Sequence, residues 1–413
     1  MMKDIANWMI RKWVDMSLVL RILFGLFVGA VLGLAVPEWT GVGIIGTVFV
    51  SALKAIAPVL VAVLVTASIA QAGEGLGPRF RTVILLYLST TLLAAFLAVM
   101  ASNAFPVVLR LTGVGAEGNP VGSLSEVLEN LLVSMVANPV GAIAGGNYIG
   151  ILFWAIVFGV GLRLAGSQAT VQVFQDLAQV VSRAVRWIIQ AAPFGILGLV
   201  FSSVSQSGLE IFTVYGQLIV LLAGCMFVHV LVTCPLVAFL MLRKNPYPLL
   251  FRCLRVSGLQ AFFTRSSAAN IPVNMGLCRR LGLNEDFYSV SIPLGATVNM
   301  NGAAITITVM TMAVAYTMGV EVSLGSALLL CVMAALGACG TSGVAGGSLL
   351  LVPMACSLFG ISSDVAMQAV AVGFIIGVVQ DSMETALNSS SDVFFTATAE
   401  YYDLKNRSVR RSE

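Results

Sequence analysis

Long apolar runs recur along the first 242 residues of this chain. Each holds about 20 residues or more, the length that an α-helix needs to cross the hydrocarbon core of a bilayer. Hydrophobic residues make up 58% of the 413-residue sequence and charged residues only 10%, which excludes an ordinary soluble domain. The sequence therefore predicts an all-α polytopic membrane protein, with spans at 17–36, 42–70, 80–102, 131–165, 182–208 and 212–242. Pro139 and Gly145-Gly146 interrupt the fourth span, so broken helical pieces are expected there.

Basic residues gather at both ends of the chain, outside the first and last apolar runs: Lys3, Arg11, Lys12, Lys405, Arg407, Arg410 and Arg411. Lysine and arginine are enriched on the cytoplasmic side of membrane proteins. Residues 1–16 and 401–413 are therefore predicted to be a cytoplasmic N-terminus and a cytoplasmic tail. The 103–130 loop is richer in glutamate and is predicted to be external. No basic domain is present, so a nucleic-acid partner is not predicted.

Four apolar segments in the second half contain small polar clusters: "TRSSAANIP" at 264–272, "NMNGAA" at 299–304, "CGTSGVAGGS" at 339–348 and "QDSMETALNSSSD" at 380–392. The first and third have apolar arms too short to span and predict re-entrant helical hairpins, while the second and fourth are long enough to cross. Two such hairpin-plus-helix units indicate an internal repeat, and secondary transporters bind their substrates where such broken segments meet. Glycine and serine could instead serve helix packing alone, but packing does not explain Asn299, Asn301, Asp381 and Asp392 together.

The fourth segment follows an apolar run without a turn signal and is predicted to continue one helix. At 100° per residue, its polar members fall within an arc of roughly 100°: Asp381, Glu384, Thr385, Asn388 and Asp392. Ionisable groups at membrane depth are costly and usually face a protein interior or a water-filled cavity. The alternative is a helix end that has already left the bilayer.

The residue types in these segments suit two kinds of ligand. A sodium ion needs about five or six oxygen ligands, which Asn299, Asn388, Asp392 and unwound backbone carbonyls could supply. A free amino acid needs one carboxylate for its ammonium group, and Asp381 fits that role. The carboxylate of the amino acid needs hydroxyl and N–H donors, which the serines and helix N-termini of the first hairpin could supply.

The four segments, in this order and at this spacing, closely resemble the signature segments of the dicarboxylate/amino acid:cation symporters, the glutamate transporter family. Within that family the chain looks most like the bacterial sodium-coupled serine/threonine transporters, and the resemblance covers essentially the whole chain. It implies eight transmembrane helices and two re-entrant hairpins in inverted repeats, assembled as a homotrimer in a bacterial inner membrane. It also implies elevator-type alternating access, in which a transport domain (79–103 and 211–400) moves against a scaffold (17–72 and 130–208).

The resemblance implies where substrate and sodium bind. Ser266 and Ser267 would hold the substrate carboxylate and Asp381 its ammonium. The full set of implied substrate contacts is Ser266, Ser267, Thr341, Asp381, Glu384, Thr385 and Asn388. One sodium site would use Asn299, Asp392 and the carbonyls of Gly295 and Asn388. A second would use Thr297 and carbonyls near Ala338, Cys339 and Thr341, and a third Tyr87, Thr90, Thr91 and Asn301.

Two residues depart from the family pattern. Glu384 stands where dicarboxylate transporters have an arginine, so acidic substrates should be repelled and a neutral side chain with a hydroxyl accepted. Serine and threonine are the substrates predicted on this ground, with alanine weaker. Asn301 stands where the family commonly has an aspartate, which puts the third sodium ion in question.

Arg265 is predicted to pair with Asp381 or Glu384 in the empty site.

Two rival functions follow from other features. "GTSG" at 340–343 could carry the nucleophile Ser342 of an intramembrane serine protease. His229, the sole histidine, lies in an apolar run and is expected to be an interior or interfacial histidine with its hydrogen bonds satisfied, and no sequence feature links it to Ser342. Rings of Asn, Thr and Asp could instead line an ion channel. The paired hairpins favour a carrier over either rival. So does the combination of a carboxylate for an ammonium group with hydrogen-bond donors for a carboxylate. No enzymatic activity is predicted.

Overall fold

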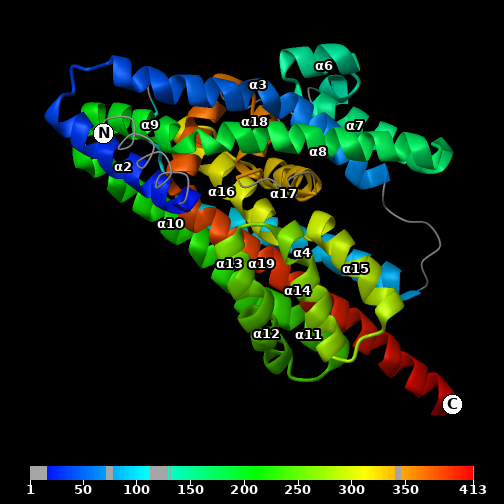
Figure 1. The fold of residues 1–413 in the computed structure, drawn as a ribbon. Coiled ribbons are helices and arrows are strands. Elements are labelled where there is room, and N and C mark those ends of the chain that lie inside the picture. Colours follow the sequence, from blue (N-terminus) through cyan, green and yellow to red (C-terminus); the bar gives the residue numbers. More distant parts are fainter. Residues whose placement is uncertain (1–15, 71–77, 112–128, 130–131, 340–345, 413) are drawn as a thin grey trace, which may run out of the picture.

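The computed structural model of the chain describes residues 16–70, 78–111, 129, 132–339 and 346–412 (Figure 1). Within these residues every regular element is a helix. Seven helical segments of the described chain are long and apolar enough to cross a membrane. The prediction of an all-α polytopic membrane protein is confirmed at this level.

One side of the molecule is built on α2 (Leu18–Ala35) and α3 (Gly41–Ala70), each of which packs along α9 (Ala192–Ser207) (Figure 1). Glycines permit the close approach of α2 to α9. A methyl group added at Gly25 would lie 2.1 Å from the carbonyl oxygen of Pro193, and one at Gly29 would lie 2.4 Å from that of Leu197. Small residues at four-residue spacing are the usual means of tight helix packing in membranes.

The helices before α9 differ in part from the predicted spans. The interruption within 131–165 is confirmed, because α6 (Pro139–Gly145) is separated from α7 (Tyr148–Ala165) by Gly146, whose φ is 67°. The predicted span 182–208 is wrong. The chain instead forms α8 (Gln168–Gln190), turns at Ala191 and begins α9 at Ala192. Because α8 is amphipathic, polar residues interrupt the apolar sequence of its first half, which was therefore not predicted as part of a span.

The other side of the molecule is built around α19 (Ser363–Ser412), with α4 (Pro78–Ala104) and α10 (Ile211–Val228) beside it. A π-helical segment, His229–Thr233, joins α10 to α11 (Cys234–Leu242). Gly208, with φ 62°, and a short 3-10 turn at Gly208–Glu210 separate α9 from α10. The long apolar segment Ala192–Leu242 is therefore not one straight helix.

A helix–turn–helix occupies the position predicted for the first hairpin. Its first arm is helical from 247 to 264, and Arg265 then adopts a left-handed conformation with φ 49°. Ser266 caps the second arm by accepting a hydrogen bond from the Ala269 N–H at 3.2 Å. The elements are α12 (Tyr247–Cys253), the π segment Leu254–Gly258, α13 (Leu259–Thr264) and α14 (Ser267–Arg280).

The arms of the second predicted hairpin are α17 (Leu324–Ala338) and α18 (Val352–Ser357), the latter preceded by a 3-10 turn at Leu349–Leu351. The centre of this hairpin, 340–345, lies outside the described residues.

The two crossing segments differ from each other. The first is broken at Asn299 and Met300, between α15 (Glu285–Val298) and α16 (Asn301–Thr317). The second is α19, whose 50 residues form an unbroken helix about 75 Å long at 1.5 Å per residue. The prediction that 380–392 continues one helix is confirmed.

Candidate functional site

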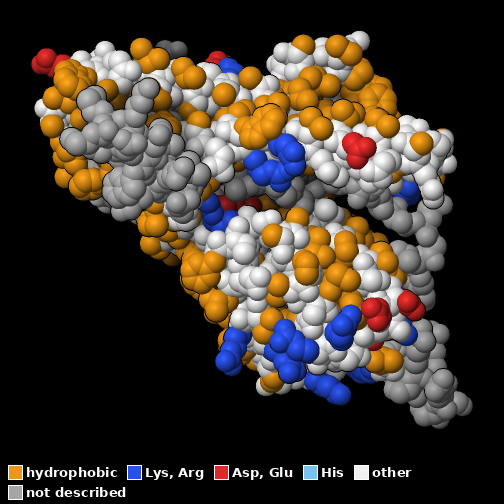
Figure 2. Space-filling model, in the orientation of Figure 1, with side chains coloured by type: hydrophobic (Ala, Val, Ile, Leu, Met, Phe, Trp, Pro, Cys, Tyr) orange, Lys and Arg blue, Asp and Glu red, His pale blue; other side chains and the backbone are white. Residues whose placement is uncertain are grey.

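The polar face of α19 points into the protein. Asp381 is 5% exposed, Glu384 6%, Asn388 3% and Asp392 0%. These residues are therefore not an exposed helix end, and the interior alternative of the sequence analysis holds. Figure 2 shows a hollow between the region of α8 and the region of α13, with acidic and basic side chains inside it.

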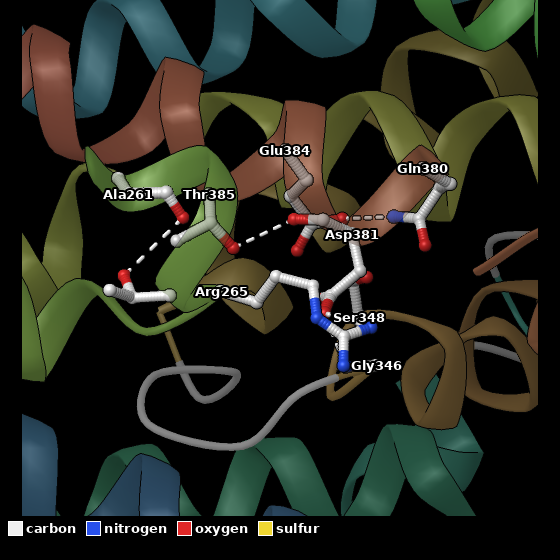
Figure 3. Close-up of polar contacts among 9 residues, drawn as sticks. Ala261, Arg265, Gly346, Ser348, Gln380, Asp381, Glu384 and Thr385 are labelled. Carbon is white, nitrogen blue, oxygen red and sulfur yellow. Dashed lines mark hydrogen bonds and ion pairs between the residues drawn. The ribbon is translucent and has the colours of Figure 1, made fainter. Parts of the chain in front are cut away.

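Asp381 lies between the two hairpins (Figure 3). Its Oδ1 accepts a hydrogen bond of 3.1 Å from the Gly346 N–H, and its Oδ2 lies 3.7 Å from Nη1 of Arg265. Both side chains are largely buried. Of the two partners predicted for Arg265, the structure selects Asp381. Thr385 donates to the Asp381 carbonyl at 2.7 Å and so bonds within its own helix.

Glu384 is the centre of a second cluster one turn further along α19. Its Oε2 accepts hydrogen bonds from Oγ1 of Thr306 at 2.7 Å, Oγ of Ser348 at 2.8 Å and Nε2 of Gln380 at 2.5 Å. The sequence analysis did not single out these three donors. Gln380 could have been found from its i, i+4 spacing to Glu384, whereas Thr306 and Ser348 come from distant segments.

Asp392 lies where the break between α15 and α16 meets α19. Its Oδ1 accepts a hydrogen bond of 2.9 Å from Nδ2 of Asn299, whose amide also donates to Oγ of Ser391 at 2.7 Å. Oδ2 of Asp392 is buried and has no hydrogen-bond partner among the described residues. A methyl group at Gly295 would lie 2.7 Å from Oδ1 of Asp392. A buried carboxylate oxygen that accepts no hydrogen bond from these residues is a suitable ligand for a cation.

Asn301 extends this cluster toward α4. Its Nδ2 donates to Oδ1 of Asn299 at 3.2 Å and to Oγ of Ser391 at 3.3 Å, and its Oδ1 accepts from Oγ1 of Thr91 at 2.9 Å. Oδ1 of Asn388 accepts a short hydrogen bond of 2.7 Å from the Gly302 N–H. The break at Asn299 and Met300 is thus held by side chains of α19 and not by backbone bonds alone.

Similarity to known proteins identifies the family. The model of the sodium:dicarboxylate symporter family matches residues 18–401. The chain belongs to this family. Among its relatives, a protein of Bifidobacterium adolescentis named serine/threonine transporter SstT is 59% identical over 387 residues, which are 94% of this chain and 90% of that protein. A protein of the same name from Streptococcus thermophilus is 54% identical over 393 residues, 95% of this chain and 97% of its own length.

Other predicted ligand residues of this symporter lie near these clusters in different ways. The hydroxyl of Tyr87 is 2.9 Å from that of Thr396 and 3.2 Å from the carbonyl oxygens of Ser291 and Asp392. Thr90 donates to the Leu86 carbonyl at 2.7 Å and Thr297 to the Leu294 carbonyl at 2.8 Å, so both bond within their own helices.

The predicted residues on the hairpins are described in part. Ser266 and Ser267 stand at the N-terminus of α14, and Ser267 is buried. Thr341 lies outside the described residues, as does Ser342 of the protease alternative. At the edge of the second hairpin, the Cys339 carbonyl accepts a hydrogen bond of 3.4 Å from Oγ of Ser68 on α3.

A further polar cluster of the symporter joins the first hairpin to α19. Nδ2 of Asn270 donates to Oγ of Ser389 at 2.7 Å and to Oγ of Ser257 at 3.0 Å. Nδ2 of Asn274 donates to the Ser389 carbonyl at 3.1 Å. All four residues are buried. The sequence analysis did not find this cluster, although Asn270 and Asn274 share one face of α14 at i, i+4 spacing.

His229 of the symporter begins the π segment after α10 and is fully buried. Neither ring nitrogen has a hydrogen-bond partner among the described residues. The sequence analysis expected an interior or interfacial histidine with its hydrogen bonds satisfied. The interior position is confirmed, and the expectation of satisfied bonds is wrong within the described chain.

Proposed function

We propose that this chain imports serine and threonine together with sodium across a bacterial inner membrane. The observation that carries the proposal is the pair of buried acids on α19, Asp381 and Glu384, each bonded to the 346–348 turn that leads into the second arm of the second hairpin. The names of the relatives, which are serine/threonine transporters, support the choice of substrates.

Asp381 would bind the ammonium group of the substrate. In the empty site its partner is Arg265, at 3.7 Å. An arriving ammonium group would replace one cation by another, so that the carboxylate is never left unpaired in a buried place. The freed guanidinium and the N-terminus of α14, which begins at Ser267, would then favour the substrate carboxylate.

Glu384 would select the side chain of the substrate. A carboxylate accepts hydrogen bonds and donates none, so it would accept one from the hydroxyl of serine or threonine. Aspartate and glutamate would bring a second negative charge into a buried site and be rejected. Alanine would fit but lack the hydrogen bond.

Sodium ions are co-transported substrates in this proposal. Oδ2 of Asp392, the Asn388 carbonyl and Oδ1 of Asn299 are the oxygen atoms from which we would build the first site. The Gly295 carbonyl would be a further ligand of this site, and a side chain at Gly295 would collide with Asp392. Thr297 and carbonyls near Ala338 and Cys339 would form the second site when the second hairpin closes. Tyr87, Thr90, Thr91 and Asn301 would form the third, at which an asparagine stands where the family commonly has an aspartate.

The two sides of the molecule would be the scaffold (17–72 and 130–208) and the transport domain (79–103 and 211–400), with eight spans, two re-entrant hairpins and inverted repeats in all. An ion pair between Lys54 of α3 and Asp364, near the start of α19, crosses their boundary. A cavity of about 510 Å³ lies beside this pair. A cavity and an exposed ion pair at the boundary support rigid-body movement of one side along the other, as in an elevator. Homotrimers would assemble through the scaffold.

The site would face the cytoplasm in this conformation. Asp381 and Arg265 line a small cavity with Leu18 and Ile22, the first residues of α2, which follow the predicted cytoplasmic N-terminus. Six exposed basic residues at the end of the molecule that carries α11, α12 and α14 support the same orientation (Figure 2): Arg243, Lys244, Arg252, Arg255, Arg279 and Arg280.

The test is uptake of labelled serine into proteoliposomes under an inward sodium gradient. Sodium should drive accumulation, threonine should compete, and aspartate should not. Accumulation that ignores sodium, or that follows a proton gradient, would overturn the ion-site proposals at Asn299, Asn388 and Asp392. Flux that never saturates or accumulates would favour a channel.

A further inference from the structure

One oxygen of Glu384 accepts every hydrogen bond that the described residues give this side chain. Thr306, Ser348 and Gln380 all donate to Oε2, and Oε1 accepts none from the described chain. The donors come from three elements: Thr306 from α16, Ser348 from the turn before the 3-10 segment of the second hairpin, and Gln380 from α19 itself. Figure 3 labels Ser348 and Gln380 beside Glu384.

The hydrogen bonds in this cluster have a fixed direction. Nε2 of Gln380 donates to Oε2 of Glu384 and also to Oγ1 of Thr306, at 2.8 Å. The Thr306 hydroxyl therefore accepts from Gln380 and must use its single hydrogen for Glu384. Thr306 and Gln380 are therefore committed as donors, and Oε2 of Glu384 acts only as an acceptor in this cluster.

Close backbone packing keeps the cluster rigid. A methyl group added at Gly302 would lie 2.9 Å from both the Cα and the carbonyl oxygen of Glu384. Since α16 and α19 touch backbone to backbone here, the backbone of Glu384 cannot shift relative to α16 without moving a helix. Glu384 is also buried, with 6% of the residue's surface exposed, so the surrounding atoms leave its side chain little room for another rotamer.

We propose that Thr306, Gln380 and Ser348 are positioning residues for substrate selection. They hold Oε2 so that Oε1 of Glu384 accepts the hydrogen bond from the hydroxyl of the amino-acid substrate. This inference rests on the proposed function. It adds that selection for a hydroxyl depends on three donors that the substrate does not touch. Ser348 further makes selection depend on the second hairpin, since Glu384 is held fully only when that hairpin packs against α19.

The test compares Thr306→Val with Thr308→Val. Both threonines lie on α16 and are fully buried, but the Thr308 hydroxyl has no hydrogen-bond partner among the described residues. Sodium-driven uptake of labelled serine is measured in proteoliposomes, with unlabelled serine and alanine as competitors. The readout is the ratio of the two half-inhibiting concentrations.

Thr306→Val should reduce the preference for serine over alanine about tenfold, because the substrate loses a hydrogen bond to a charged group. The half-inhibiting concentration of serine should rise, and that of alanine should stay unchanged. Thr306→Ser, which retains the hydroxyl, should restore the preference, and Thr308→Val should keep it. Gln380→Met and Ser348→Ala should act in the same direction as Thr306→Val, and they carry the test if Thr306→Val does not reach the membrane.

Equal weakening of serine and alanine in these variants would indicate a structural role alone and overturn the inference. An unchanged ratio would do so as well. Either result leaves the proposed function intact, whereas wild-type protein that does not accumulate serine with sodium defeats the proposed function itself.

Discussion

Gly295→Ala is the sharpest test of the proposed sodium site. Gly295 is buried in α15, opposite Asp392 and Tyr87. The added methyl group would lie 2.7 Å from Oδ1 of Asp392 and 2.9 Å from the hydroxyl of Tyr87. Both distances are well inside the ~3.5 Å at which non-bonded heavy atoms pack best. One of the two side chains, or α15 itself, must therefore move by several tenths of an ångström.

The size of the effect follows from the cost of overpacking. Forcing one extra methyl group into a tightly packed interior costs about 1–3 kcal/mol. If this cost falls on the sodium-bound state, in which Asp392 is held in place, sodium affinity falls about 5- to 150-fold, at 1.4 kcal/mol per factor of ten. The half-saturating sodium concentration for serine uptake should rise accordingly.

The assay is serine uptake into proteoliposomes at a series of sodium concentrations. Gly216→Ala is the matched control, because a methyl group at this position of α10 meets nothing within 4 Å. It should leave the sodium dependence as in the wild type. If Gly295→Ala gives the same half-saturating sodium as Gly216→Ala, while both proteins reach the membrane in equal amounts, Asp392 does not bind the coupling ion.

Three further predictions concern single residues. Arg265→Ala should slow net serine uptake more than serine exchange, because only net uptake requires return of the empty carrier with Asp381 unpaired; equal effects on the two rates would contradict this. Glu384→Arg should abolish serine competition and gain aspartate competition, and retention of serine preference would argue against Glu384 as the selecting residue. Asn301→Asp should steepen the sodium dependence of serine uptake, because a carboxylate beside Oδ1 of Asn299 needs a further cation; an unchanged slope in an active variant would show that this position does not limit the number of ions.

Much of the fold is predictable from the sequence because the bilayer requires long apolar helices with few charges. The helices at Leu18–Ala35, Gly41–Ala70 and Pro78–Ala104 lie close to the predicted spans. The error at 182–208 has the same physical origin. Hydropathy detects helices that are apolar on all faces, whereas α8 (Gln168–Gln190) has a polar face, so its first half was not predicted as part of a span.

The polar residues of the candidate site were also predictable, but their partners were not. Asp381, Glu384, Asn388 and Asp392 follow from helical periodicity on one segment, since positions along a single helix are fixed by its 100° step. Thr306 and Ser348, which bond Glu384, are separated from it by 78 and 36 residues. No local rule relates residues so far apart, and nothing in the sequence of "ITITVM" distinguishes Thr306 from Thr308.

The sequence by itself determined that the chain is helical, that it lies in a membrane and that one face of its last long helix is charged. Each of these follows from composition and short-range periodicity, which need no knowledge of neighbours. Only the tertiary structure decided that Asp381 pairs with Arg265, that Glu384 is held by three donors, and that one oxygen of Asp392 accepts no hydrogen bond from the described residues. The physical reason is that a carboxylate buried in a membrane protein is defined by the groups that desolvate and bond it, and folding brings these together from different helices.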